Sequence, residues 1–319
     1  MAVLVGIDEA GFGPILGPLV VSSSSFSLPR DFLEADLWEI LRKSIGKKRK
    51  HLAGRLLIAD SKKAHNKRDG TKHLKRTILA CLRYLDKQPA TLTELLGLLS
   101  PDCVERLSSY PWYQNAAAYE IAGNNTDIKI ASEVLKDELS SNKMKLLELK
   151  SCCLDVAYYN KMVGSVKNKA RVLFGATTQL IQKAYDDFSG DDLQVIVDRQ
   201  GGRVHYRREL LRSFADMELK ILLESPRASS YELKAGGKGV RLHFVVGADE
   251  RFLPVSLASM VSKYLRELLV DNINRYFSGF DAELKPTAGY WKDGLRFIED
   301  LKKKIPHVQY ENEQLIRCR

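Results

Sequence analysis

The sequence has few cysteines and no long apolar run, and both shortages narrow what the chain can be. Its 319 residues include five cysteines, an odd number with no CxxC spacing. This argues against a disulfide framework and against a structural zinc site. The N-terminal stretch reaches the charged pair Asp8-Glu9 early, and the apolar run 15–21 is interrupted by Gly17 and Pro18. We therefore expect neither a signal peptide nor a membrane span, and reduced thiols in a cytoplasmic protein.

The histidines give no sign of a metal site either. The six histidines show no close metal-ligand spacing such as HxxxH. A serine or cysteine triad is a spatial arrangement, and sequence order alone supports none here. The chemistry must therefore be sought among other residue types.

Positive charge is in excess. Lys and Arg number 50 against 40 Asp and Glu, which gives a net charge of +10. A positive surface attracts polyanions, and nucleic acid is the commonest of these. The basic run 42–51 (RKSIGKKRKH) is either a solvated loop or a phosphate contact, and the sequence leaves both readings open.

Apolar periodicity indicates a mixture of strands and helices. We expect a tight hairpin first and alternating elements later, hence an α/β domain with a mixed sheet. The expected strands are 3–7, 16–26, 146–156, 193–197 and 240–246. The expected helices are 31–43, 71–87, 168–188, 207–223, 254–277 and 291–304, with further helical pieces in 88–145.

Three acidic sites recur in one local context. Asp8-Glu9, Asp198 and Asp249 each follow a short apolar strand, and strand ends of one sheet can gather on one rim. Converging carboxylates repel one another unless cations neutralise them. Oxygen ligands without histidine or thiolate suit Mg²⁺ or Mn²⁺. Taken singly, each aspartate also fits an ordinary turn or cap. For Asp8 and Glu9 to face one site the chain must bend, since strand side chains alternate.

Five segments, in this order, resemble the type 2 ribonuclease H family (ribonuclease HII). The first and longest is the opening GIDEAGFGPILGPLVV, whose counterpart in the family is an Asp-Glu-Ala-Gly-Arg-Gly-Pro signature. The others are Asp60-Ser61-Lys62-Lys63, VIVDRQGG (195–202), GADERFLPVSLASMVSKYLRE (247–267) and Gly289-Tyr290. Together they reach from residue 3 to about residue 300.

The resemblance implies an RNase H-like mixed sheet flanked by helices, and endonucleolytic cleavage of RNA in duplexes that contain DNA. The family's four metal-binding, catalytic carboxylates correspond to Asp8, Glu9, Asp198 and Asp249. In the two-metal scheme one ion lowers the pKa of an attacking water and the other stabilises the leaving 3′ oxygen, so that a 3′-hydroxyl remains. Asp8 is the position that would bridge both Mg²⁺ or Mn²⁺ ions.

The resemblance also implies substrate contacts. Lys62 would contact a phosphate, and Tyr290 would meet the nucleotide beside the RNA–DNA junction. Ser259 and Lys263 would face the substrate backbone or brace the site. The plain alternatives are exposed lysines, a packing tyrosine and ordinary helix packing.

Two departures from the family affect the expected substrate. The family has arginine between the glycines of its Gly-Arg-Gly loop, whereas this chain has Gly11-Phe12-Gly13. Phenylalanine cannot donate a hydrogen bond, although its ring could pack under a sugar or base and the glycine amides could approach a ribose. The second departure is the length of the middle region. We therefore expect three parts of the chain: an RNase H-like core (1–87 and 146–285), a mainly helical insertion (88–145) and a C-terminal helical segment (286–319).

Three functions therefore remain open. The first is a metal-dependent ribonuclease acting on an RNA–DNA hybrid or a ribonucleotide-containing duplex. The second is a nuclease of this fold with another substrate, such as structured RNA or branched DNA. The third is a non-catalytic nucleic-acid-binding relative, against which the retained carboxylates argue. No membrane association and no obligate protein partner are expected.

Overall fold

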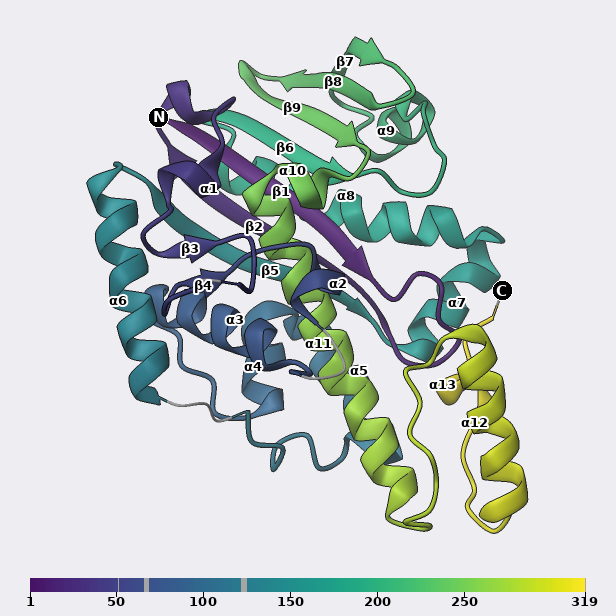
Figure 1. Ribbon diagram of the computed structural model, residues 1–319. Coiled ribbons are helices and arrows are strands. Elements are labelled where there is room, and N and C mark those ends of the chain that lie inside the picture. Colours follow the sequence, from purple (N-terminus) through teal and green to yellow (C-terminus); the bar gives the residue numbers. More distant parts are fainter. Residues whose placement is uncertain (51, 66–68, 122–124, 319) are drawn as a thin grey trace.

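A seven-stranded mixed sheet forms the centre of the computed structural model, which describes residues 1–50, 52–65, 69–121 and 125–318 (Figure 1). The strand order is β5-β2-β1-β6-β9-β8-β7. The central strands β1, β6 and β9 run parallel, and the flanking pairs are antiparallel. The bounds are β1 (Ala2–Ala10), β2 (Leu19–Leu28), β5 (Lys145–Leu154), β6 (Asp192–Asp198), β7 (Glu218–Glu224), β8 (Ala228–Ala235) and β9 (Lys238–Val245). The predicted α/β class, mixed sheet and β1–β2 hairpin are confirmed.

Helices cover both faces of this sheet. The long helix α11 (Leu253–Ser278) crosses β1 and β2 on one face, and α8 (Lys169–Phe188) lies on the other (Figure 1). Alternate residues of β1 divide between the two layers, because successive side chains of a strand point to opposite faces. Ala2 and Leu4 belong to the core around α11, whereas Val5 and Ile7 belong to the core around α8. The first strand is apolar as far as Ile7 because this part is buried on both faces.

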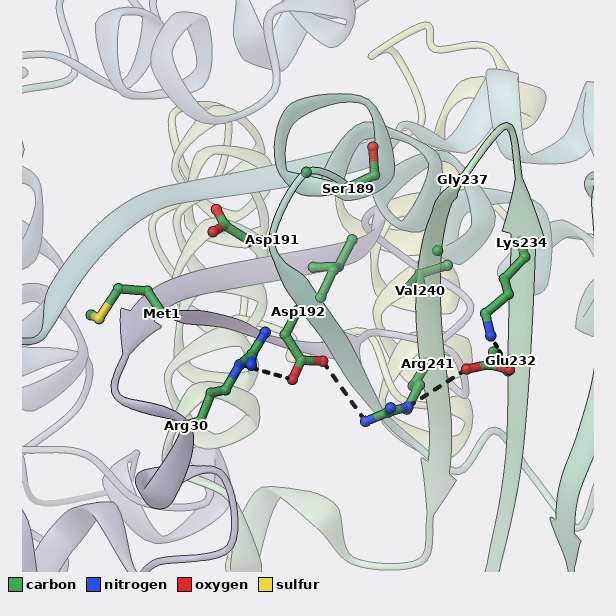
Figure 2. A pocket seen from close by; sticks show the side chains of 13 residues that line it. Met1, Arg30, Ser189, Asp191, Asp192, Glu232, Lys234, Gly237, Val240 and Arg241 are labelled. Atoms are coloured by element: carbon green, nitrogen blue, oxygen red, sulfur yellow. Dashed lines mark ion pairs between the residues drawn. The ribbon is translucent and has the colours of Figure 1, made fainter.

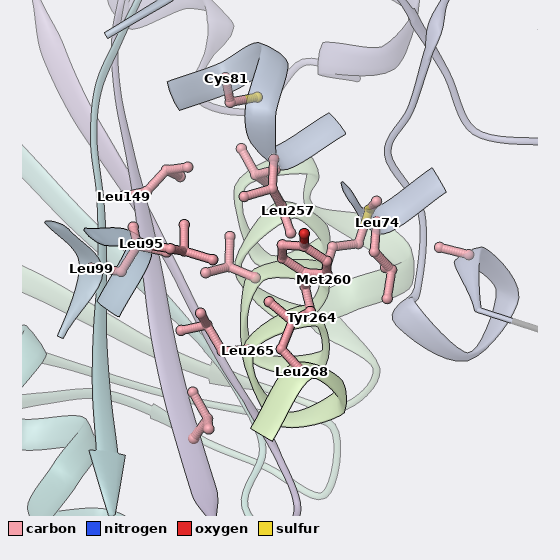
Figure 3. Close-up of a cluster of buried hydrophobic side chains, with 14 of the residues drawn as sticks. Leu74, Cys81, Leu95, Leu99, Leu149, Leu257, Met260, Tyr264, Leu265 and Leu268 are labelled. Carbon is pink, nitrogen blue, oxygen red and sulfur yellow. The ribbon is translucent and has the colours of Figure 1, made fainter. Parts of the chain in front are cut away.

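The middle region packs beside α11 on the same face of the sheet, and several of its elements also contact β5. Its elements, together with α3 (Lys72–Tyr84), share one hydrophobic cluster with α11 and β5 (Figure 3). They are α4 (Leu92–Leu99), η2 (Pro101–Cys103), α5 (Val104–Ser108), η3 (Pro111–Tyr113) and α6 (Asn125–Ser141). The region therefore contributes to the main core and is more than a surface elaboration. Its assignment as an insertion stays a prediction.

Two predicted helices are wrong in part. Only η1 (Arg30–Phe32) and α1 (Leu37–Ile40) occur within the range 31–43. The predicted helix 207–223 is a short helix, α9 (Arg207–Ser213), followed by strand β7. The run ELKILLE shows no clean alternation of apolar and polar residues. Its strand form depends on pairing with β8, a strand that the periodicity also failed to predict.

The remaining elements are short or lie near the end of the chain. They are β3 (Ile45–Gly46), β4 (Leu56–Leu57), α2 (Ser61–Ala64), α7 (Val156–Val166), α10 (Ala248–Arg251), α12 (Trp291–Lys304) and α13 (Asn312–Leu315). Within the described ranges, no helix is both long enough and apolar enough to cross a membrane.

Helix α11 approaches β1 closely at one glycine. A Cβ on Gly6 would lie 2.2 Å from the carbonyl carbon of Pro254 and 2.2 Å from the amide nitrogen of Val255. On the neighbouring strand the Ser24 hydroxyl donates to the Pro254 carbonyl at 2.7 Å. Small side chains on the sheet thus set the distance between sheet and helix.

We expect Gly6→Ala to destabilise the fold, because the added methyl group meets backbone atoms that cannot rotate away. The expected loss in free energy of unfolding is on the order of 1–3 kcal/mol, as for overpacked cores. Gly164→Ala on α7 is the matched control, since a Cβ there meets nothing within 4 Å. It should leave stability unchanged or raise it by about 0.5–1 kcal/mol. Urea unfolding of both variants tests this, and equal stabilities would contradict the close contact.

Candidate active site

The four predicted carboxylates lie at one rim of the sheet. Asp8 and Glu9 are near the carboxyl end of β1, and Asp198 is the last residue of β6. Asp249 is in α10, which follows β9 directly. Because β1, β6 and β9 are adjacent and parallel, their carboxyl ends meet. Residues separated by up to 241 positions in the chain are brought together in this way.

The expected bend between Asp8 and Glu9 is absent. Strand β1 stays paired with β2 as far as Ala10, so the two side chains keep the alternation of a strand. Asp8 follows the row of Leu4 toward α11, and Glu9 follows the row of Ile7 toward α8. Both lie beyond Ile7, the last residue of β1 that pairs with β6. Their carboxyl groups therefore interact around the open end of the parallel pair.

Asp8 is the buried centre of this cluster, with 6% of its surface exposed. Burial raises its pKa well above the usual range, and the charges of Glu9 and Asp198 raise it further. A hydrogen bond with Ser259 opposes the rise. The backbone amide of Glu9 also donates to Asp8 Oδ1 at 2.7 Å. A carboxyl group surrounded by like charges calls for a cation.

The other three carboxylates respond to the same surroundings. Burial, followed by the charge of Asp198, raises the pKa of Glu9 to about 7. The same two causes raise the pKa of Asp249 to about 6. Burial also raises the pKa of Asp198, although the Ala248 amide donates to its Oδ1 at 2.7 Å and opposes the shift. Four carboxyl groups thus carry raised pKa values on one rim.

One lysine and one further aspartate border the cluster. The positive charge of Lys62 lowers the pKa values of Glu9, Asp198 and Asp249. The Lys62 side chain is exposed, at the start of the short helix α2. Asp60 caps this helix by accepting the Lys62 amide at 2.9 Å, and its charge raises the pKa values of Asp198 and Asp249. Lys62 is thus a basic side chain whose charge acts on three of the four carboxylates.

A row of serines on α11 supports the cluster from below. The Ser256 hydroxyl donates to the Asp249 carbonyl, and the Ser262 hydroxyl donates to the Asp8 carbonyl at 2.9 Å. Ser259 is 2% exposed, and its oxygen lies 3.0 Å from the Ser61 hydroxyl oxygen. These positions are three residues apart, so they share one face of the helix. Ser259 therefore braces Asp8 from within the protein.

Lys263, one turn beyond Ser259, is held by an acidic neighbour. Its ammonium lies 2.6 Å from Glu267 Oε1, and the side chain is 13% exposed. Glu267 also accepts from Arg266 at 3.3 Å, and His65 Nε2 lies 3.8 Å from its second oxygen. Lys263 thus belongs to a partly buried charge network beside the site.

The loop after β1 and Tyr290 form a second group of predicted residues. Gly11 has φ +94°, and a Cβ there would lie 2.6 Å from the Pro18 carbonyl oxygen. The Phe12 ring packs at the edge of the core around α8, with Lys169 Nζ 5.3 Å from its centre. Gly13 is exposed. Tyr290 is 51% exposed, and the buried Arg266 guanidinium lies 5.5 Å from its ring centre.

The opposite end of the sheet shows how this protein treats acidic groups elsewhere. A 580 Å³ pocket there is lined by both signs of charge (Figure 2). Asp192 pairs with Arg30 at 3.5 Å and with Arg241 at 3.7 Å, and Glu232 pairs with Lys234 at 2.9 Å. Its acidic side chains are matched by basic ones, whereas the four carboxylates on the other rim outnumber their basic neighbour Lys62.

The donor chemistry of that rim fits a hard divalent cation. Its ligating groups would be carboxylate oxygens, buried and mutually repelling. In the part of the chain that the structure describes, no three His, Cys, Asp or Glu side chains stand close enough to hold a metal ion. The identity of the ligands is therefore a proposal, taken up below.

Several residues that the structure places at the site have no role in the sequence-based predictions. Asp60 and Arg266 fall within the quoted motifs but received no role. Ser256 and Ser262 left a detectable signal, a spacing of three with Ser259 in a first part of the helix (253–262) that is otherwise apolar. Arg317, which contacts the loop after β1, lies outside every quoted motif and gave no signal.

Comparisons with known proteins give similarities of fold at low sequence identity. No family model and no curated protein matches the chain. Ribonuclease HII of Archaeoglobus fulgidus, solved with PCNA, is 17% identical, with a TM-score of 0.45 over 99% of this chain and 94% of that one. RNase H3 of Aquifex aeolicus is 15% identical, with a TM-score of 0.44 over 98% and 71% of the two chains. Ribonuclease H2 of Pyrococcus horikoshii OT3 is 14% identical, with a TM-score of 0.48 over 98% and 92%.

The raised pKa of Glu9 predicts a pH-dependent stability without metal. Between its ordinary value of 4.5 and about 7, the folded state holds a proton that the unfolded state has lost. Stability therefore falls as the pH rises through this window. Glu9→Gln removes the penalty and should stabilise the protein at pH 8 by on the order of 1–3 kcal/mol.

Urea unfolding in the presence of a chelator, at pH 5 and pH 8, checks this expectation. The stabilisation by Glu9→Gln should shrink toward pH 5, where the folded wild type is already protonated at this position. The exposed Glu105 on α5 provides the matched control, Glu105→Gln. A Glu9→Gln effect of the same size at both pH values would show that repulsion is not its cause.

Proposed function

We propose that the chain is a metal-dependent endonuclease that cleaves the RNA strand of RNA–DNA hybrids and leaves a 3′-hydroxyl. The observation that carries this proposal is the cluster of Asp8, Glu9, Asp198 and Asp249, whose pKa values are all raised on one rim. The five motifs that resemble type 2 ribonucleases H supply the substrate class.

Each residue of the rim has a proposed task. The four carboxylates would hold divalent ions, Mg²⁺ or Mn²⁺, and the buried Asp8 would be their central ligand. When bound, such ions supply the positive charge that an attacking water and a leaving 3′ oxygen require. Ser259 and Ser262 hold Asp8 through neutral hydroxyls, and neutral partners leave its negative charge available to a cation. Lys62 would orient the phosphate beside the cluster.

Lys47, in the basic run 42–51, reaches the same rim. Lys47 Nζ donates to the Glu250 carbonyl at 2.6 Å, and Lys63 Nζ pairs with the Glu250 carboxylate at 2.5 Å. Glu250 directly follows Asp249. A backbone bound at the carboxylates would therefore pass these lysines, which favours the phosphate-contact reading of the run.

The loop 11–13, in which Gly13 is exposed, and Tyr290 would form the nucleotide-facing surface. The glycine amides can approach a sugar closely, and the half-exposed Tyr290 ring offers a stacking surface. The side chain of Phe12 supplies no hydrogen-bond donor, and Lys169 is the cation beside its ring. This feature favours a second candidate, a nuclease of the same fold with another substrate such as structured RNA or branched DNA.

Asp8→Asn and Asp198→Asn test the catalytic assignment. Both substitutions keep the size of the side chain but remove a charge that a metal ion would need. We expect cleavage of a hybrid to fall by at least about 100-fold, the upper end of what the loss of a supporting outer-shell partner costs. Binding of the hybrid, measured by fluorescence anisotropy, should persist.

The exposed Asp191, before β6 at the other end of the sheet, gives the matched control Asp191→Asn. Undiminished cleavage by Asp8→Asn or Asp198→Asn would refute the assignment. The substrate is tested with a hybrid, a duplex with one ribonucleotide, duplex RNA and branched DNA, each with Mg²⁺ or Mn²⁺. Cleavage of duplex RNA or branched DNA without cleavage of a hybrid would favour the second candidate. Tight binding without any cleavage would favour a non-catalytic relative.

A further inference from the structure

The C-terminal segment 316–318 returns to the loop that follows β1. The Arg317 amide donates to the Ile15 carbonyl at 2.8 Å, and Ile316 forms an antiparallel bridge with Leu16. The Arg317 guanidinium donates to the Pro14 carbonyl. About 300 residues of chain separate the partners of these contacts.

A second segment holds the loop from another side. The amides of Ile15 and Leu16 donate to the Gly289 carbonyl at 2.8 and 3.2 Å. Arg266 on α11 donates to the carbonyls of Ala288 at 2.8 Å and Leu16 at 3.4 Å. The loop is thus fixed between the segment that carries Tyr290 and the C-terminal segment.

Two buried arginines make this arrangement unusual. Arg266 is 1% exposed and Arg317 is 4% exposed. Burial, together with the charge of Arg266, lowers the pKa of Arg317 to about 10. Arg266 has Glu267 beside it, whereas within the described chain Arg317 has the Pro14 carbonyl and the Tyr159 ring, 4.8 Å away. Burying a cation without a carboxylate partner costs free energy, which the contacts between Arg317 and the loop have to offset.

The geometry of the loop shows which of its sides is held by the arginines and which is open. A Cβ on Gly11 would lie 2.8 Å from Arg266 Cδ, so the inner side of the loop rests directly on that buried arginine. A Cβ on Gly13 would meet nothing within 4 Å, so the outer side is open to a ligand. The carbonyls of Pro14 and Leu16 point to the arginines. These contacts hold in place the backbone that directly follows residues 11–13.

We propose that Arg317 is a positioning residue, and that the C-terminal segment thereby forms part of the substrate-recognition surface. Arg317 fixes the loop 11–17 so that Gly11, Phe12 and Gly13, together with Tyr290, meet the nucleic acid in one arrangement. The proposal rests on the nuclease function proposed above. It leaves the carboxylates to their own supports on α11.

Helix α7 offers a second way to release the same segment. Asn160 Nδ2 donates to the Ile316 carbonyl at 2.8 Å, and the Cys318 amide donates to Asn160 Oδ1 at 2.7 Å. Asn160 is only partly buried, so Asn160→Ala should disturb the core less than loss of Arg317. Two variants on different elements should therefore give one phenotype.

Hydrogen exchange tests the clamp without reference to activity. In Arg317→Ala and in Asn160→Ala, the amides of Ile15 and Leu16 should exchange about tenfold faster or more, the scale of one lost hydrogen bond to a charged group. Exchange along β1 should be unchanged. Lys303→Ala, which removes an exposed cation from the same C-terminal region, is the control. Unchanged exchange at Ile15 and Leu16 in both variants would overturn the proposal.

Steady-state cleavage of a hybrid tests the consequence for recognition. Arg317→Ala should raise KM about tenfold with kcat within about twofold of wild type, as expected when binding is lost and the reacting groups are intact. Arg317→Lys, which keeps the charge and one donor, should recover most of the KM. A lowered kcat with unchanged KM would overturn the positioning role. If the wild type cleaves nothing, the nuclease proposal fails, while the exchange data still decide whether the clamp exists.

Discussion

The close contact between α11 and the first two strands is the constraint on which the site depends. Gly6 on β1 lets the helix begin almost against the sheet, and Ser24 on β2 bonds to the Pro254 carbonyl. Because the helix begins at this point, its repeat determines which α11 residue lies beneath each part of the rim. Ser259 comes under the Asp8 side chain, and Arg266 comes under the loop after β1. A larger side chain at Gly6 would therefore move every support at once.

The carboxylate rim makes folding less favourable, and the same carboxyl groups are the ones that could carry out chemistry. Burial and mutual repulsion raise the pKa values of all four carboxyl groups, which makes their charged forms unfavourable in the metal-free protein. At the other end of the same sheet, Asp192 and Glu232 are paired with arginine and lysine (Figure 2). The chain thus pairs these partly buried acids with basic side chains and does not do so fully at the rim. Such a concentration of perturbed groups is a mark of functional sites.

Local pattern was enough to predict what depends on local structure. The apolar strands before Asp8 and Asp198, and the long helix after Pro254, were visible because each is strongly periodic. The strand β7 was not, because its run of leucines becomes a strand only by pairing with β8. The contact of Arg317 with Pro14 was also invisible, since it joins the two ends of the chain and follows from no motif. The choice of Asp8, Glu9, Asp198 and Asp249 came from their shared position after strands together with the family resemblance.

The supports of the rim and of the loop differ in charge, and this difference separates their tasks. Beneath Asp8 the helix presents the neutral hydroxyls of Ser259 and Ser262, which satisfy hydrogen bonds without competing with a metal ion. One to two turns further on it presents Arg266, whose charge is balanced by Glu267 and directed at backbone carbonyls. A cation in place of Ser259 or Ser262 would neutralise the carboxylates and weaken any metal site. The order of serine before arginine along one helix therefore keeps the proposed metal site and the proposed recognition surface adjacent but electrostatically distinct.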